Sequence, residues 1–140
     1  MDRQIGSGAL VLVLAVALLL AAASLAGPAT DTDGDTVFDV LDNCLDIPNA
    51  APGDCDTDND GYGNSCDADF DQNFAVNAVD FNTHFVPSFK NGLPTFTGTD
   101  MDCNGSVASV DFSKYFVPQF KLGKPGPSGL HCAGTVPCDL

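Results

Sequence analysis

Aspartate at alternating positions is the feature of this 140-residue sequence that most restricts its fold. Four twelve-residue segments begin and end with aspartate, at residues 31–42, 56–67, 69–80 and 100–111. Each carries oxygen-bearing side chains at the spacing that a loop uses to wrap a calcium ion. Carboxylates at this density repel one another unless a cation lies between them. The spacing therefore predicts four calcium-binding loops, numbered one to four along the chain.

The predicted ligands occupy the first, third, fifth, ninth and twelfth places, while the seventh place offers its backbone carbonyl. They are Asp31, Asp33, Asp35, Asp39 and Asp42 in loop one; Asp56, Asp58, Asp60, Asn64 and Asp67 in loop two; Asp69, Asp71, Asn73, Asn77 and Asp80 in loop three; and Asp100, Asp102, Asn104 and Asp111 in loop four. Ala108 takes the ninth place of loop four, where we expect water. Glycine, which permits the sharp turn at the sixth place, is replaced there by Thr36 and Phe74. We therefore expect unequal affinities, with loop three the weakest.

The charge balance excludes several classes of partner. The formal net charge is −14, and all 19 acidic residues are aspartate. Nucleic acids and anionic membranes both require lysine and arginine, of which the chain has only five. A solvated acidic linker is the alternative interpretation of the loops, but it does not require one spacing to occur four times. Calcium fits better than magnesium, which prefers few protein ligands and retains its waters.

The amino terminus has a different composition. Residues 9–23 are apolar, and small Ser24 and Ala26 lie where a signal peptidase would cleave. We predict that residues 1–26 are a signal peptide. The alternative is an uncleaved membrane anchor, because residues 5–26 are long enough to span a bilayer. Both predict an exported protein, secreted or at the cell surface, with membrane contact only if this segment remains attached.

The second half contains an internal duplication, in which residues 69–90 align with residues 100–121 without a gap. Phenylalanines recur at four-residue steps, a period that places them on one face of a helix. They are Phe81, Phe85 and Phe89 in the first copy and Phe112, Phe116 and Phe120 in the second. We predict two loop–helix motifs that pack their phenylalanine faces together. Pro87 and Pro118 should end or kink each helix, and Val76 and Val107 should pair in a short β-bridge.

Residues 31–67, with DTDGDTVFDVLDNC, IPNA and DTDNDGYGNSCD, resemble thrombospondin type 3 repeats. The resemblance implies an irregular segment, residues 27–68, that is wrapped around calcium and linked by disulfides. In that family the cysteine after the first Asp-Asn pairs with one near the end of the next motif. The pair implied here is Cys44–Cys66.

Residues 69–121 resemble a dockerin type I domain, in which two loop–helix calcium motifs are closed by aspartate. Phe74, Ala108 and the helix prolines depart from the family pattern. In dockerins that bind cohesins, the tenth and eleventh loop places carry much of the recognition. The candidate partner-binding residues are then Ala78 and Val79 in one motif and Ser109 and Val110 in the other. Their similarity would permit binding in either of two orientations.

All six cysteines lie in the exported part, and an even count in a short secreted chain predicts disulfides. Beyond Cys44–Cys66, our hypothesis is Cys103 with Cys132 and Cys55 with Cys138. Residues 122–140 form a proline- and glycine-rich tail that contains cysteines, and its first part, residues 123–130, cannot be helical. The expected fold is small, loop-rich and stabilised by calcium and disulfides. It joins an irregular thrombospondin type 3-like segment to a mainly α dockerin-like pair of loop–helix motifs.

The sequence favours a binding module over an enzyme. Its two histidines, His84 and His131, lie in separate regions, and no serine or cysteine has a matching histidine and acid. The expected function is a secreted calcium-binding structural or adhesion module that calcium folds, without catalysis. The alternative is a dockerin-type docking module that binds a cohesin-like or other cell-surface protein.

Overall fold

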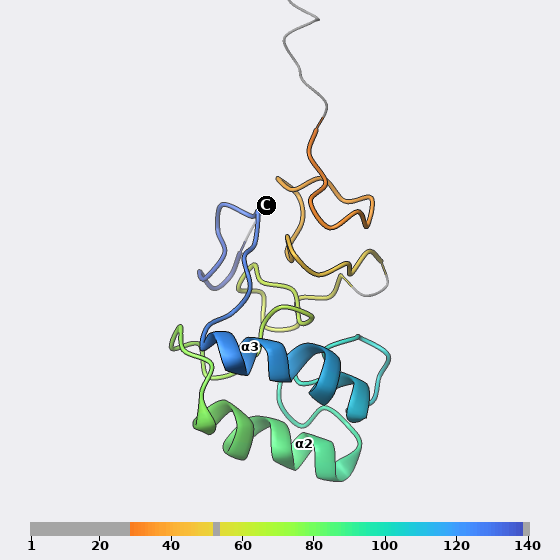
Figure 1. Cartoon of the computed structure of the whole chain (residues 1–140). Coiled ribbons are helices and arrows are strands. Elements are labelled where there is room, and N and C mark those ends of the chain that lie inside the picture. The colour runs from red at the N-terminus through yellow and green to blue at the C-terminus, as the bar shows by residue number, and fades with distance from the viewer. Residues whose placement is uncertain (1–28, 52–53, 139–140) are drawn as a thin grey trace, which may run out of the picture.

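The computed structural model describes residues 29–51 and 54–138. The predicted signal peptide lies outside this part of the chain. Irregular loops form one end of the molecule, and two helical segments lie side by side at the other (Figure 1). The helical segments are η1 (Asp80–Phe85) leading into α2 (Val86–Asn91), and η2 (Asp111–Phe116) leading into α3 (Val117–Leu122). The described residues contain no strand, and no helix among them is long and apolar enough to cross a bilayer.

Each helical segment continues through its proline, so of the two predicted outcomes, an end or a kink, the end is wrong and the kink stays a prediction. The first half, η1 or η2, is a π-helix, and the second half is an α-helix with proline in its first turn. Proline has no N–H to donate, and the first turn of an α-helix is where that loss is tolerated. The helices end instead at Gly92 and Gly123, whose φ values of 68° and 72° are left-handed. Glycine adopts this C-terminal conformation without strain.

The two motifs exchange backbone hydrogen bonds reciprocally. The N–H of Val76 donates to the carbonyl of Gly123 at 3.2 Å, and the N–H of Val107 donates to that of Gly92 at 3.1 Å. The start of each helical segment therefore lies beside the end of the other, and the two run antiparallel (Figure 1). The predicted β-bridge between the valines is not present in the described residues. Both side chains are buried, but each backbone pairs with the helix end of the other motif.

The phenylalanine faces pack together as predicted. Phe85 and Phe116 are almost fully buried, and their ring centroids lie 4.9 Å apart. Phe89 and Phe120, at the outer ends, are each 43% exposed. The core extends beyond the helices into the loops, and its buried members are Ala68, Phe70, Val76, Phe85, Met101, Val107, Tyr115 and Phe116. Ile47, which precedes loop two, is partly buried and packs against this core.

Three disulfides close the described part of the chain. Cys44–Cys66 is confirmed, with Cα atoms 5.6 Å apart. The other two hypotheses are wrong, because the structure pairs Cys55 with Cys103 and Cys132 with Cys138. Cys55 precedes loop two and Cys103 lies within loop four, and these loops pack against each other. The last pair closes a local turn in the tail. Three such bonds fit an extracellular or secreted protein.

Candidate metal centres

One backbone turn is common to all four loops. The sixth-place residues Thr36, Gly61, Phe74 and Gly105 have φ values of 82°, 89°, 64° and 89°. This left-handed region suits glycine, whereas other residues there are strained by about 1–3 kcal/mol. Loops one and three therefore adopt the turn that the spacing predicts, even though Thr36 and Phe74 oppose it.

The first aspartate of every loop holds that turn in the same way. Its carboxylate accepts a hydrogen bond from the backbone N–H of the sixth-place residue, over donor–acceptor distances between 2.5 and 3.1 Å. The acceptors are Asp31, Asp56, Asp69 and Asp100. In three loops, the fifth-place side chain also accepts from the seventh-place N–H; these side chains are Asp35, Asp60 and Asn104. The repeated bonding curls each loop around its carboxylates.

Each loop brings three carboxylates together, with ligand oxygens within 4.8 Å of one another. The groups are Asp31, Asp33 and Asp35 in loop one; Asp56, Asp58 and Asp60 in loop two; Asp69, Asp71 and Asp80 in loop three; and Asp100, Asp102 and Asp111 in loop four. The twelfth-place residues Asp80 and Asp111 join their groups, and both are completely buried. Asp42 and Asp67 are also buried but lie outside these groups, where each accepts the N–H of the residue two positions later.

In loops one and two, the ninth-place residue binds the second-place threonine. The Asp39 carboxylate accepts the N–H of Thr32 at 2.7 Å and its hydroxyl at 2.9 Å. The side-chain oxygen of Asn64 accepts the backbone N–H of Thr57 at 3.0 Å and its hydroxyl at 3.1 Å. These side chains therefore close the loop from outside the carboxylate groups, and their role as calcium ligands stays a prediction.

The neutral side chains of loops three and four also bond to backbone. The side-chain oxygen of Asn77 accepts the backbone N–H of Val79 at 2.8 Å. The backbone N–H of Asn77 donates to the carboxylate of Asp80 at the same distance. Ala108 donates its N–H to Asp111 in the same way at 2.7 Å. Asn73 is exposed. The two later loops are thus closed through the twelfth-place aspartate, which distinguishes them from the first two.

The carboxyl groups of loops two and three raise one another's pKa. Burial raises the pKa of Asp67 well above its ordinary value, and the charge of Asp60 raises it further. Burial and the same neighbour raise the pKa of Asp58 to about 6. Asp39 is different, because a hydrogen bond from Thr30 lowers its pKa. Burial is also the main cause of a raised pKa at Asp33, Asp42, Asp60, Asp69 and Asp100. A bound cation would favour the charged forms and oppose this effect.

One carboxylate oxygen at loop three has no hydrogen-bond partner among the residues that the structure describes. Asp80 is completely buried, and its Oδ1 atom is unpaired. The Oδ2 atom of Asp33, in loop one, is also buried and unpaired. Buried polar atoms without partners are uncommon and costly. A cation at each group would satisfy these atoms, and an all-oxygen ligand set suits a hard ion such as Ca²⁺.

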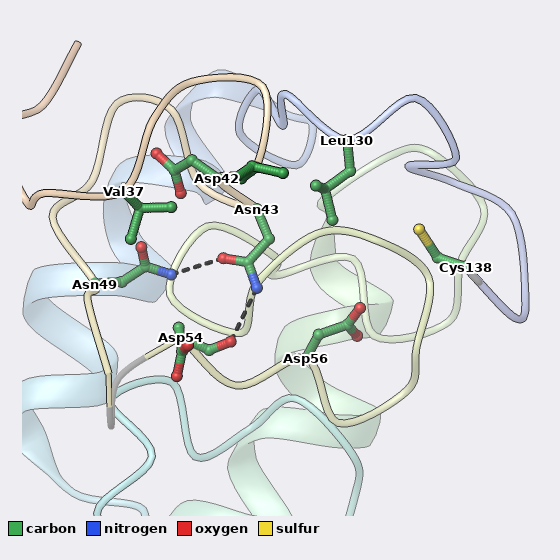
Figure 2. A pocket seen from close by; sticks show the side chains of 9 residues that line it. Val37, Asp42, Asn43, Asn49, Asp54, Asp56, Leu130 and Cys138 are labelled. Atoms are coloured by element: carbon green, nitrogen blue, oxygen red, sulfur yellow. Dashed lines mark hydrogen bonds between the residues drawn. The ribbon is translucent and has the colours of Figure 1, made fainter. Parts of the chain in front are cut away.

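A pocket lies where loop one, the segment before loop two and the tail meet (Figure 2). Two amide side chains cross it. Asn49 donates its side-chain N–H to the side-chain oxygen of Asn43 at 2.9 Å, and Asn43 donates to the carbonyl of Asp54 at 3.0 Å. Leu130 and Cys138 bring the tail to the same pocket (Figure 2). These contacts hold loop one against loop two, which the Cys44–Cys66 disulfide also does.

No family model, curated protein or solved structure matches this chain. The interpretation of the site therefore rests on its own residues. Sequence reasoning did not identify Thr32 and Thr57 as loop-closing residues. The repeated Asp-Thr-Asp start of loops one and two was a signal that could have found them.

Proposed function

We propose that this protein is a secreted calcium-binding module, folded by calcium, which serves as a structural or adhesion unit and catalyses no reaction. The observation that carries the proposal is the unpaired Oδ1 of completely buried Asp80, within a loop whose bonding recurs in the other three. Three disulfides support an extracellular setting. There calcium is abundant, so sites with dissociation constants of about 10⁻⁴–10⁻³ M suffice.

The carboxylate group of each loop would hold one ion. The chemistry that the ion supplies is charge neutralisation, because three carboxylates within 4.8 Å would otherwise repel one another. The first-place aspartates orient their oxygens through the sixth-place N–H bonds. In the duplicated half, Asp80 and Asp111 begin the helical segments. A ligand at a helix start connects ion binding directly to helix formation.

A calorimetric calcium titration of the oxidised, chelator-treated protein tests this proposal. We expect up to four ions to bind, one per loop. Asp80→Asn should remove one ion, because it replaces the buried charged ligand of loop three by a neutral amide. Asp46→Asn makes the same chemical change at an exposed position outside the loops and should leave the stoichiometry unchanged. Absence of binding at millimolar calcium would instead indicate a solvated acidic linker.

A docking module is the second candidate function, and a symmetric pair of exposed valines favours it. Val79 and Val110 are 47% and 45% exposed, and the neighbouring Ala78 and Ser109 are also exposed. The reciprocal backbone hydrogen bonds between the two loop–helix motifs place Val79 and Val110 at equivalent positions. A partner could therefore dock in two orientations.

Binding of purified cohesin domains tests the docking proposal. Val79→Asp or Val110→Asp alone should each leave one orientation usable, whereas the double variant should lose binding. Val40→Asp, at a valine that is 73% exposed in loop one, is the matched control. Absence of binding to every cohesin domain tried would leave the structural or adhesion role as the proposal.

A further inference from the structure

Loops two and four contact each other directly, although 36 residues separate the bonded positions. The side-chain N–H of Asn64 donates to the carbonyl of Asp100 at 2.9 Å. The hydroxyl of Ser65 donates to the carbonyl of Met101 at 2.7 Å. A third bond joins the N–H of Gly98 to the hydroxyl of Thr57 at 2.7 Å. Two loops that belong to different halves of the sequence thus form one continuous structure.

These contacts involve the residues that define the two ion sites. Asp100 is the first-place aspartate of loop four, and Asn64 is the ninth-place residue of loop two. Cys103, which is bonded to Cys55, lies between the predicted ligands Asp102 and Asn104. The disulfide therefore joins the chain just before loop two to the inside of loop four. The hydrogen bonds and the disulfide thus connect the backbones of the two loops.

The region in which loops two and four contact each other is buried, so the contact is rigid. Ser65 is 1% exposed and Met101 is fully buried. Gln119, in α3, donates its side-chain N–H to the carbonyl of Ser65 at 2.9 Å. Close-packed interiors deform little. Loop two is therefore held in place both by loop four and by the helix of the motif to which loop four belongs.

We propose that loops two and four bind calcium as one coupled pair, in which an ion in either loop raises the affinity of the other. This inference rests on the proposed function. An ion in loop four fixes Asp100 and the chain up to Cys103, and thereby orders the contacts that loop two needs. Such coupling is reciprocal by thermodynamic necessity, and typical couplings change affinity by about 5-fold or more.

The chain provides a luminescence reporter within loop two. It has no tryptophan and two tyrosines. Tyr62 occupies the seventh place of loop two, where its carbonyl is a predicted ligand, so it can sensitise the luminescence of Tb³⁺ bound there in place of Ca²⁺. Tyr115 lies in η2, and its hydroxyl contacts Lys114 at 2.6 Å. Tyr62 also lies close to loop three, because it lines one pocket together with Asp69 and Phe74. Tyr115→Phe combined with Asp80→Asn, which should remove the loop-three ion, therefore leaves emission from loop two.

The test is a Tb³⁺ titration of the oxidised full protein carrying Tyr115→Phe and Asp80→Asn. Adding Asp102→Asn, which weakens loop four, should raise the concentration for half-saturation of loop two by about 5-fold or more. Ser65→Ala should raise it in the same direction by a smaller factor, since it removes one contact and no ligand. Ser113→Ala is the control, because its hydroxyl bonds only within its own exposed helical turn.

The outcomes separate this inference from the proposed function. Sensitised emission whose half-saturation is the same with and without Asp102→Asn would overturn the coupling and leave loop two as a metal site. The Ser65→Ala result decides the question in the same way if the Asp102→Asn protein does not fold. Absence of Tyr62-sensitised emission at any Tb³⁺ concentration would overturn both the coupling and the proposed function of loop two.

Discussion

Removal of calcium by a chelator is expected to abolish most of the helical circular dichroism of the oxidised protein. Asp80 and Asp111 begin the two helical segments and are completely buried. A buried carboxylate without a counter-charge is costly enough to become neutral or to force the chain open. Asp42, Asp60, Asp67 and Asp69 are buried as well. The small apolar core cannot offset so many uncompensated charges, so binding free energy becomes folding free energy.

Circular dichroism in excess chelator, followed by addition of calcium, measures this effect. The helical signal should return on addition, because the intact disulfides limit the unfolded chain and favour refolding. Magnesium at the same concentration should restore less of the signal, since it prefers fewer protein ligands. A helical signal that persists in excess chelator would contradict a calcium-folded module, whatever the binding stoichiometry.

The local structure of the loops could be predicted because calcium-loop spacing is a local property. Asp31, Asp56, Asp69 and Asp100 each accept the N–H five residues later, as their spacing requires. The turn is dictated strongly enough that Phe74 adopts the left-handed backbone without being glycine. The packing of the phenylalanine faces was likewise predictable from a period of four residues.

Most of the errors concern interactions between distant residues, and one concerns a local rule. Spacing alone could not show that loops two and four pack together, and so it could not pair Cys55 with Cys103. The proline rule predicted that the helix ends or kinks at Pro87, but the helix does not end there, and the proline lies in the first turn of the α-helix that follows the π-helix. Val76 and Val107 are buried, as apolar residues at the eighth place should be, yet their partners are the glycines after the helices. Local sequence patterns thus show which cysteines and backbone groups must be bonded, whereas the tertiary fold determines the residues to which they bond.

Phe116→Ala is expected to destabilise the calcium-bound protein by about 3–5 kcal/mol. Phe116 is 2% exposed and packs between both motifs. Its ring centroid lies 4.9 Å from that of Phe85, 5.6 Å from that of Phe81 and 6.0 Å from that of Phe70. Small proteins are stable by only about 5–15 kcal/mol, so this variant should be close to unfolding. Urea unfolding in saturating calcium measures the change in the free energy of unfolding.

Phe120→Ala makes the same chemical change one helical turn later and is the matched control. Phe120 is 43% exposed, so it loses less buried area, and the expected cost is about 1 kcal/mol. The difference between the two variants isolates the burial of Phe116 from the effect of deleting any aromatic ring. Equal losses would mean that the two motifs do not pack through Phe116. The helices would then depend on calcium and on the other buried members of the core, among them Val76, Met101 and Val107.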